Sequence, residues 1–518
     1  MNDKIERVVI VGGGTAGWIS AGILARKLSA NEGKVSITLI ESPDIPIIGV
    51  GEGTWPTIRN TLQTIGVDET DFIRECDATF KQGAEFVNWQ YTPEYDKKHS
   101  YFHPLSAVFH SAYDFNLAPY WLAQKERFGA YDFATTTQSK VSQLGLAPKK
   151  ITTPAYSAIQ NYSYHLNASK FADFLKSHCI NKLAVNFISA NVTQVETTDK
   201  QFITKVMTDR AGEVEGDFFI DCSGSKALLI GDALGVGWHS VSDIILNDTA
   251  LAVQVPYPSA SHPIASHTIA TAQECGWTWD IGLSNRRGIG YVYSSNHSTE
   301  SQAEQVLRQY VGHQSEGLEI RKISLNLGYR KEFFKGNCVA IGMSAAFIEP
   351  LEASAIFLIE AAANMVAECF PRYRESLPIV AKKFNDTFKL RWDKSVDFIK
   401  LHYCISKRRD TQYWCDNTDS STVPDSLQQK LTLWRTQVPN KYDFDYAFEP
   451  FVLDSYLFVL YGMGYDTKVD LSQLDTQKIS LANAKFEEIK MISEKLRTEL
   501  ISHRELIDKV RQFGFQKI

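Results

Sequence analysis

The glycine-rich turn Gly12–Gly17 constrains the fold of this chain more than any other feature of its sequence. The turn follows an apolar run, Val8–Val11, of the kind that forms a buried parallel strand. It reads G-x-G-x-x-G and opens a helix that we predict over Trp18–Leu28. In this pattern the first glycine allows a tight turn, the second lets a pyrophosphate approach the backbone, and the third lets the helix pack closely on the strand.

A second strand and an acidic residue complete the pattern. The strand predicted over Val35–Ile40 ends in Glu41, 29 residues after Gly12, where a carboxylate can bind the hydroxyl pair of a ribose. Free amides at the start of the helix can hold the phosphates. An ordinary glycine-rich turn is the alternative, but such a turn does not require strand, glycines, helix, strand and acid in this order. The sequence therefore predicts a βαβ unit that binds a dinucleotide.

The remainder of the chain carries no second fingerprint of this kind. The glycine clusters Gly49–Gly53 and Gly462–Gly464 lack the flanking strand and helix. We infer that the chain holds one dinucleotide and has no dedicated NAD(P)H domain. If that dinucleotide is FAD, its electrons come from another protein.

The composition excludes several classes of protein. With 44% hydrophobic and 22% charged residues, the chain has the make-up of a soluble globular protein. Its net charge of −6 argues against a nucleic-acid binder, which usually carries a basic excess. We find no run of about 18 apolar residues, and so we expect no membrane span.

Two further features bear on the compartment. The segment Met1–Arg7 is charged and leads directly into a strand, unlike a secretory signal. The eight cysteines form no C-x-x-C pair and no zinc-like cluster. We expect reduced thiols, no metal site and a cytoplasmic protein.

Several short segments are more specific than the glycine turn. They occur in one order over most of the chain up to about residue 415: Glu41–Pro56, Ala78–Gly83, Tyr164–Ala168, Asp221–Gly224, Glu349–Ser354, His402–Tyr403 and Arg409–Trp414. Together these segments resemble those of the flavin-dependent halogenases of the tryptophan halogenase family. In that family the counterpart of Glu41–Pro56 straps across FAD. The resemblance implies that FAD is bound by Gly12, Gly14, Thr15, Ala16, Gly17, Glu41, Gly49, Gly51, Gly342 and Ile356.

The resemblance also implies a fold and a division into modules. We expect a mixed α/β fold in which residues 1–400 form a Rossmann-like FAD-binding module of the flavin monooxygenase type, with inserted substrate-side segments. Residues 401–518 are expected to form a mainly helical, aromatic-rich module packed against it. Within them Ile479–Phe513 has the pattern of an amphipathic helix of mixed charge.

Lys81 and Glu352 are the catalytic residues that the resemblance implies. A primary amine can hydrogen-bond hypohalous acid or form a haloamine, and it does so best when burial lowers its pKa. A solvated surface lysine is the alternative interpretation of Lys81. Glu352 would lie across the substrate from Lys81 and remove the ring proton after halogen addition. Alternatively, its carboxylate stabilises a helix N-terminus.

The amides of Ser354 and Ala355 lie at the predicted start of a long apolar helix, Ile356–Phe370, and suit a halide ion. The family usually has P-L-E-S-T-G where this chain has P-L-E-A-S-A over residues 350–355. The amides survive this change, but the conformational freedom of a glycine at position 355 is lost. We therefore expect an effect on halide affinity or preference.

The segment Trp277–Gly282 resembles the family's W-x-W-x-I-P motif, with Gly282 in place of proline. Residues two apart on a strand share a face, so Trp277 and Trp279 can together wall off the flavin from the substrate. Two tryptophans that merely fill a core are the alternative. In the first interpretation, Gly282 would loosen the wall.

The match thins where the substrate is recognised. Tryptophan-specific members place paired tyrosines and a glutamate late in the chain, whereas Asp454–Phe458 offers one tyrosine, Tyr456. His103 is a second candidate for the pocket wall, although a lone histidine is more often structural. The region is aromatic enough to hold an indole or a phenol. It does not imply that free tryptophan is the substrate.

The leading hypothesis is a two-component halogenase. A separate NAD(P)H-dependent reductase would supply reduced FAD, oxygen would give a C4a-hydroperoxide, and chloride or bromide would yield hypohalous acid for an aromatic substrate of the tryptophan, indole or phenol type. A flavin-dependent aromatic hydroxylase and a catalytically degenerate FAD-binding protein are the alternatives. The sequence leaves the oligomeric state open, with a homodimer as one possibility.

Overall fold

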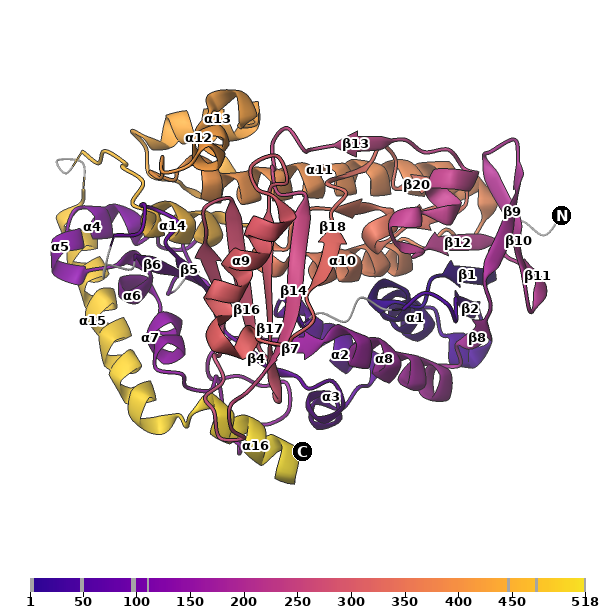
Figure 1. The fold of residues 1–518 in the computed structure, drawn as a ribbon, viewed down its shortest axis with the longest axis horizontal. Coiled ribbons are helices and arrows are strands. Elements are labelled where there is room, and N and C mark those ends of the chain that lie inside the picture. Colours follow the sequence, from indigo (N-terminus) through magenta and orange to yellow (C-terminus); the bar gives the residue numbers. More distant parts are fainter. Residues whose placement is uncertain are drawn as a thin grey trace. The chain divides into compact units, whose positions relative to one another are not determined.

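The computed structural model describes residues 4–46, 51–94, 99–109, 111–444, 448–470 and 474–516. Their contacts group into two compact units, each built from three segments (Figure 1). The first unit comprises Met1–Ala78, Leu166–Val241 and Asn326–Trp392, and the second comprises Thr79–His165, Ser242–Leu325 and Asp393–Ile518. The last segment of the second unit thus begins close to residue 400. That residues 401–518 act as a module of their own stays a prediction.

A six-stranded sheet forms the centre of the first unit. Its strand order is β20 (Phe334–Lys335), β21 (Cys338–Ala340), β12 (Phe218–Asp221), β1 (Arg7–Val11), β2 (Ser36–Glu41) and β8 (Asn186–Ser189). All neighbours are parallel except β20, which is antiparallel to β21. Val9 lies opposite both Phe219 and Thr38, so β1 is an inner strand. This position explains its continuous apolar run, because an inner parallel strand is covered on both faces.

The helix after the glycine turn is α1 (Thr15–Lys27), and it contacts α8 (Ala168–Leu183) and α10 (Ala355–Glu368). Every residue from Gly17 to Ala25 is buried, which accounts for the apolar character of the helix on all sides. The predicted strand–turn–helix–strand unit is confirmed. The helix begins three residues earlier than predicted, because Gly14 is the extended N-cap residue and Thr15 is the first helical one.

Smaller elements complete the first unit. One antiparallel sheet consists of β9 (Val192–Thr198), β10 (Phe202–Thr208) and β11 (Gly212–Glu215), and another of β13 (Trp238–Ser240), β19 (Gly328–Arg330) and β22 (Ala346–Phe347). The segment after Glu41 includes the short strand β3 (Gly51–Gly53) and leads into α2 (Thr57–Ile65), and α3 (Glu69–Glu75) follows. Helix α2 contacts both α1 and α10.

A seven-stranded sheet forms the centre of the second unit. Its strand order is β18 (Arg321–Ser324), β14 (Thr249–Pro256), β17 (Arg286–Tyr293), β16 (Gly276–Gly282), β15 (Thr268–Ala272), β5 (Gly83–Val87) and β6 (Ser100–Pro104). Only β15 and β5 pair in parallel. Helix α9 (Glu300–Val311) packs on alternate residues of β14 and β17, such as Val253 and Tyr291.

A short strand, β4 (Thr79–Lys81), pairs with residues Ser163–His165 of β7 (Ser163–Asn167). Besides α9, the described helices of this unit are α4 (Ala118–Leu122), α5 (Lys125–Phe128), α6 (Tyr131–Thr135), α7 (Gln138–Gln143), the C-terminal part of α11 (Leu377–Cys404), α12 (Gln412–Thr418), α13 (Asp425–Trp434), α14 (Leu453–Gly462), α15 (Thr476–Glu499) and α16 (His503–Phe513). The single helix predicted over Ile479–Phe513 is wrong in one respect, because Ser502 caps a new helix by accepting a hydrogen bond from the Glu505 amide.

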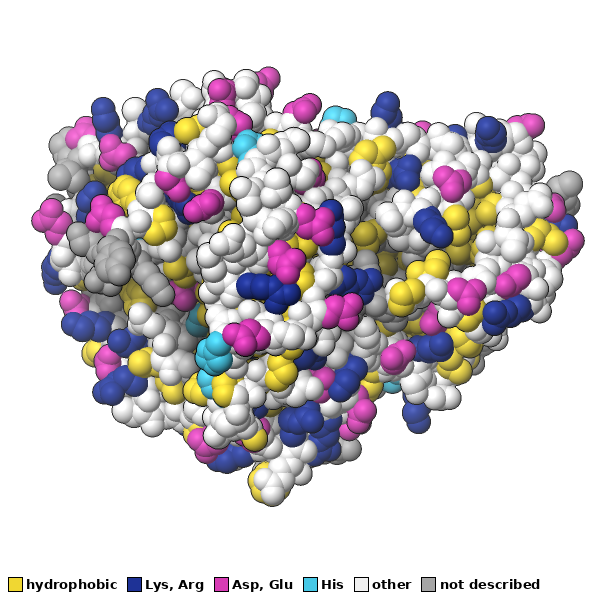
Figure 2. Space-filling model, viewed as in Figure 1, with side chains coloured by type: hydrophobic (Ala, Val, Ile, Leu, Met, Phe, Trp, Pro, Cys, Tyr) yellow, Lys and Arg dark blue, Asp and Glu magenta, His cyan; other side chains and the backbone are white. Residues whose placement is uncertain are grey.

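The surface and the thiols add two observations. On the face drawn in Figure 2, side chains of both charges are interspersed over the described residues. All eight cysteines are free thiols, and Cys76, Cys179, Cys222 and Cys338 are buried. Among the described residues, no helix is both long and apolar enough to span a bilayer.

Candidate active site

Two glycines of the turn in the first unit are required by close backbone contacts. Gly12 has φ +117°, and a Cβ placed on it would lie 2.1 Å from the Cys222 carbonyl oxygen. A Cβ on Gly17 would lie 1.9 Å from the Gly12 carbonyl oxygen. Both distances are impossible for real atoms. The tight turn and the close helix–strand packing predicted for these positions are therefore confirmed.

Gly14 differs from these two glycines, because in the described part of the structure no atom beyond its own neighbours lies within 4 Å of the Cβ position on it. It stands at the N-terminus of α1, where Thr15 and Ala16 begin the helix and free amides are available. Glu41 packs against the same turn, since a Cβ on Gly13 would meet the Glu41 side chain at 2.2 Å. Open space before a helix N-terminus, beside a carboxylate at the end of the second strand, fits the diphosphate and ribose of FAD.

Of the further predicted cofactor residues, Gly342 adjoins this turn and Ile356 lies on a helix that packs against α1. Gly342 has φ +80°, and a Cβ on it would lie 2.7 Å from the Ala16 Cβ. Ile356 is a buried residue of α10, the helix that contacts α1. Gly51 begins β3, and Gly49 lies outside the described residues.

The loop before α10 has an unusual backbone. Glu352 has φ +68° and Ala353 has φ +53°, both in the left-handed region that side-chain-bearing residues rarely adopt. The Trp55 indole Nε1 donates a hydrogen bond to the Glu352 carbonyl oxygen at 2.8 Å. The Trp55 ring also stacks on Phe357 of α10, with ring centroids 4.4 Å apart and an interplanar angle of 19°. The segment before α2 and the Glu352 loop are thus in direct contact.

The two predicted halide residues lie where the loop becomes helix. Ser354 is the N-cap residue of α10, is buried, and makes no side-chain capping bond, while Ala355 is the first helical residue. The backbone at Ala355 is therefore ordinary helix. Position 355 therefore does not require the conformational freedom of a glycine. The residues with left-handed backbone are Glu352 and Ala353. The effect on halide affinity stays a prediction.

Lys81 ends strand β4 in the second unit, and its side chain is only 3% exposed. The interpretation as a solvated surface lysine is therefore wrong. The residue pairs with Ser163, two positions before His165. Burial, and after it the positive charge of Lys81, lower the pKa of the buried His165 imidazole well below its usual value.

His503 fixes the strand of Lys81 from the other end of the sequence. Its Nε2 accepts a hydrogen bond from the Phe80 amide at 3.0 Å, and its Nδ1 lies 3.1 Å from the Ile264 carbonyl oxygen. These roles require a neutral ring with the proton on Nδ1. Burial lowers the pKa of His503 to about 4, in agreement with that state.

The glycine that follows Lys81 is also required by packing. A Cβ on Gly83 would lie 2.5 Å from the His103 carbonyl oxygen, because β5 pairs Gly83 with Pro104 of β6. His103 is buried, with its ring 5.9 Å from Phe398 and 6.1 Å from Phe458 between centroids. Lys81 therefore lies on β4, two residues before β5, and His103 lies on β6, which pairs with β5.

The two tryptophans of the W-x-W segment lie on β16, buried, with ring centroids 6.4 Å apart. Trp277 also contacts Trp89 at 6.3 Å, so it belongs to an aromatic core as well as to any wall. Gly282 ends this strand, and its carbonyl oxygen accepts a hydrogen bond from the Thr79 hydroxyl at 2.5 Å. A Cβ on Gly282 would lie 2.7 Å from Ile264, so the position is tightly packed.

Tyr456 is a fully buried residue of α14, and burial raises the pKa of its phenol well above the usual value. Its ring lies 4.9 Å from that of Phe398, and the Lys430 ammonium lies 5.1 Å from its centroid. Phe398 contacts both His103 and Tyr456 and was missed by sequence reasoning. A direct contact between Tyr456 and a substrate stays a prediction.

Comparison with known proteins decides what this arrangement belongs to. A sequence model of the tryptophan halogenase family matches residues 7–477. Tryptophan 6-halogenase SttH of Streptomyces toxytricini is 33% identical over 482 residues, which cover 89% of this chain and 89% of SttH. This chain belongs to the tryptophan halogenase family.

Solved structures show the same relationship. A tryptophan halogenase from Shewanella frigidimarina has a TM-score of 0.96 and 44% identity, with all of both chains covered. Tar14, a tryptophan C-6 flavin-dependent halogenase from taromycin biosynthesis, has a TM-score of 0.90 and 34% identity over 98% of this chain and all of Tar14. The predicted α/β fold and the predicted membership of a flavin-dependent halogenase family are confirmed.

In this halogenase-family chain, sequence reasoning missed three further residues near the candidate site, besides Phe398, because their roles arise from tertiary contacts. Trp55 lies inside the segment that resembles the FAD strap, Glu360 is a charged residue inside an apolar helix, and His503 is a lone histidine near the C-terminus. Only Glu360 carried a signal, because a carboxylate within the run Ile356–Phe370 is out of place unless it has partners.

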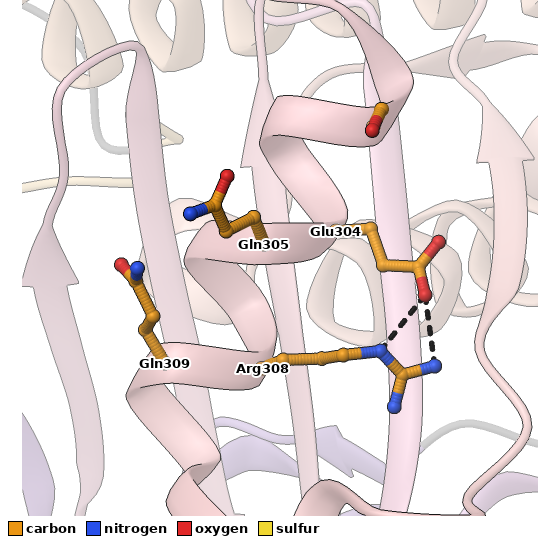
Figure 3. Close-up of a pocket in the computed structure, with 5 residues that line it drawn as sticks. Glu304, Gln305, Arg308 and Gln309 are labelled. Carbon is orange, nitrogen blue, oxygen red and sulfur yellow. Dashed lines mark hydrogen bonds and ion pairs between the residues drawn. The ribbon is translucent and has the colours of Figure 1, made fainter.

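A surface pocket elsewhere in the second unit carries none of the predicted site residues. It has a volume of about 510 Å³ and lies along α9, lined by Ser301, Glu304, Gln305, Arg308 and Gln309 (Figure 3). Arg308 Nε donates to Glu304 Oε1 at 2.8 Å, one helical turn away. This is an ordinary ion pair on an exposed helix face. In the described part of the chain, no cluster of His, Cys, Asp or Glu has the make-up of a metal site.

Proposed function

We propose that this chain is an FADH2-dependent halogenase that uses hypohalous acid to halogenate an electron-rich aromatic of the tryptophan, indole or phenol type. The observation that carries the proposal is the burial of Lys81. A lysine residue that is only 3% exposed, within a family match spanning residues 7–477, is held away from water where its amine can meet an oxidant.

The cofactor is FAD, held by the Gly12–Gly17 turn, by Glu41 and by the Ala16–Gly342 contact. When bound in its reduced form, FAD supplies the oxygen-dependent chemistry that converts chloride or bromide into hypohalous acid. The chain has one dinucleotide fingerprint, so a separate NAD(P)H-dependent flavin reductase delivers the reduced cofactor. The amides at Ser354 and Ala355, at the N-terminus of α10, hold the halide.

Lys81 holds the hypohalous acid by a hydrogen bond from Nζ or as a haloamine, and so fixes where the halogen meets the ring. His503 and Ser163 keep the strand of Lys81 in place through the Phe80 amide and through strand pairing. The Glu352 carboxylate stabilises the cationic ring intermediate and accepts its proton.

The aromatic side chains of the second unit suit the substrate. His103 faces Phe398 and Phe458, and Trp277 and Trp279 supply a wall of two indoles. The Tyr456 ring packs edge-on against the Phe398 ring. An electron-rich ring is stabilised between such groups by stacking and edge contacts.

The test is a substrate screen of the purified chain with FAD, NADH and an added flavin reductase. Indoles, phenols and free tryptophan are each incubated with chloride or with bromide, and the products are identified by mass spectrometry. The proposal predicts halogen incorporation that requires both halide and reductase. Hydroxylated products that form without halide would replace the proposal by the hydroxylase alternative.

A further inference from the structure

The Glu352 loop is held in a conformation that its own sequence does not favour. Glu352 and Ala353 are consecutive residues with positive φ, and neither is glycine. Such backbone strain persists only where surrounding contacts over-determine it, and it often marks functional loops. Within the loop, the Ala353 amide donates to the Pro350 carbonyl oxygen at 2.9 Å, which closes a local turn.

The hydrogen bond from Trp55 acts on the strained peptide itself. The Trp55 indole Nε1 lies 2.8 Å from the carbonyl oxygen of Glu352. That oxygen belongs to the peptide between the two left-handed residues. A donor at this position favours the observed orientation of the peptide over one in which the carbonyl turns away. The Glu352 side chain leaves the same Cα, so its direction depends on this orientation.

Two contacts fix Trp55 in turn. Its ring stacks on Phe357, in the first turns of α10. Immediately after Trp55, helix α2 begins at Thr57, and the hydroxyls of Thr57 and Thr61 donate to the Glu360 carboxylate at 3.0 and 2.5 Å. Glu360 is 2% exposed, and burial raises its pKa to about 8. The segment Trp55–Thr61 is therefore attached to α10 at both ends.

We propose that Trp55 is a positioning residue for Glu352: its indole N–H holds the strained peptide and thereby directs the Glu352 carboxylate, while the contacts with Phe357 and Glu360 hold Trp55 on α10. This inference rests on the proposed function, because it assumes that the Glu352 carboxylate is used. It assigns a task to a tryptophan in the segment before α2 and explains how the loop keeps two left-handed residues without glycine.

The test is Trp55→Phe in the full chain with FAD and reductase. Phenylalanine keeps a six-membered ring to stack on Phe357 and removes the N–H together with the five-membered ring of the indole. We expect kcat to fall by about 10- to 100-fold, since a small misplacement of a reacting group has effects of this size. We expect KM for the aromatic and the affinity for FAD to change less than about twofold by the same argument. Trp238→Phe is the control, because Trp238 Nε1 has no hydrogen-bond partner among the described residues, and it should leave kcat unchanged.

A double-mutant cycle separates positioning from general damage. If Trp55 acts through the Glu352 carboxylate, Trp55→Phe should lower the rate of the wild type and have no further effect in Glu352→Gln. An equal fractional loss in both backgrounds would overturn the inference, as would an unchanged rate for Trp55→Phe alone. A wild-type rate for Glu352→Gln would overturn the proposed role of Glu352 and this inference with it.

Hydrogen exchange provides a readout that does not depend on activity. In the cofactor-free chain, Trp55→Phe should speed amide exchange in peptides that cover residues 350–355, and should leave exchange in the remainder of α10 unchanged. Unchanged exchange over residues 350–355 would show that the loop holds its shape without the indole N–H, and would overturn the inference.

Discussion

The two units place their chemical groups by different means. In the first unit the candidate groups stand on strained or left-handed backbone: Gly12 at φ +117°, Gly342 at +80° and Glu352 at +68°. In the second unit Lys81 stands on a regular strand, held by pairing with β7 and by the His503 ring. A regular ladder places a side chain through many equivalent bonds, whereas a strained turn depends on a few specific contacts. The carboxylate site should therefore be the more easily displaced of the two.

The largest effects are expected at the glycine turn, where two neighbouring substitutions should fail in different ways. Gly12→Val puts a side chain into the Cys222 carbonyl at a left-handed position and should destabilise the first unit by about 4 kcal/mol or more. Gly14→Val meets no other atom among the described residues, so the protein should fold normally and lose FAD affinity by more than about tenfold, or 1.4 kcal/mol. Urea unfolding and FAD titration of both variants measure the difference. Normal FAD affinity in Gly14→Val would contradict the assignment of the Gly12–Gly17 turn as the FAD site.

Glu360 should give the first unit a stability that falls as pH rises. Its folded pKa of about 8 lies above the ordinary value of 4.5, so the fold favours the protonated form, and the stability it confers is lost between about pH 4.5 and 8. Glu360→Gln should remove this slope. The wild-type unit should lose roughly 3 kcal/mol of stability between pH 5 and pH 8, and the variant should not lose it. Glu368→Gln, at the exposed end of the same helix, is the control. Identical slopes for wild type and Glu360→Gln, measured by hydrogen exchange of first-unit peptides, would rule this out.

His503 should give the second unit the opposite slope. Its folded pKa of about 4 lies below the ordinary 6.5, so the fold favours the neutral ring, and stability is lost as pH falls from about 6.5 to 4. His503→Gln keeps a donor and an acceptor and should reduce that loss by about 3 kcal/mol, seen in peptides of β4 and α16. His313→Gln, at an exposed histidine, serves as the control. A loss of stability at pH 4.5 as large in His503→Gln as in the wild type would contradict the neutral assignment.

The smallest effect sharpens the contrast between strained and regular backbone. Ala353→Gly should raise stability by about 0.5 kcal/mol. The steric penalty that alanine bears at positive φ exceeds the entropic cost of ordering a glycine there. Ala361→Gly, in the middle of α10, should lower stability by about 1 kcal/mol. Urea midpoints for the pair test the sign. A loss in both variants would mean that Ala353 bears no strain.

The local features of this chain were predictable from its sequence, and the features that depend on distant contacts were not. The Val8–Glu41 unit follows from apolar runs and glycine spacing, which act within about 35 residues. The left-handed Glu352 and Ala353 could not be foreseen, because P-L-E-A-S-A contains no glycine to signal positive φ. His503 acts on Phe80 from 423 positions away, and no local pattern encodes that contact. The break between α15 and α16 was missed because a polar cap at Ser502 barely interrupts the amphipathic period.

The most direct test of the account is Lys81→Ala, assayed with FAD, reductase, halide and an aromatic that the wild type halogenates. Oxygen consumption, FAD affinity and halogenated product are measured on the same sample. Product formation should fall by about 10²–10⁴-fold, while FAD affinity and oxygen consumption stay close to those of the wild type. A Lys81→Ala protein that forms halogenated product at the wild-type rate would show that Lys81 takes no part in halogen transfer.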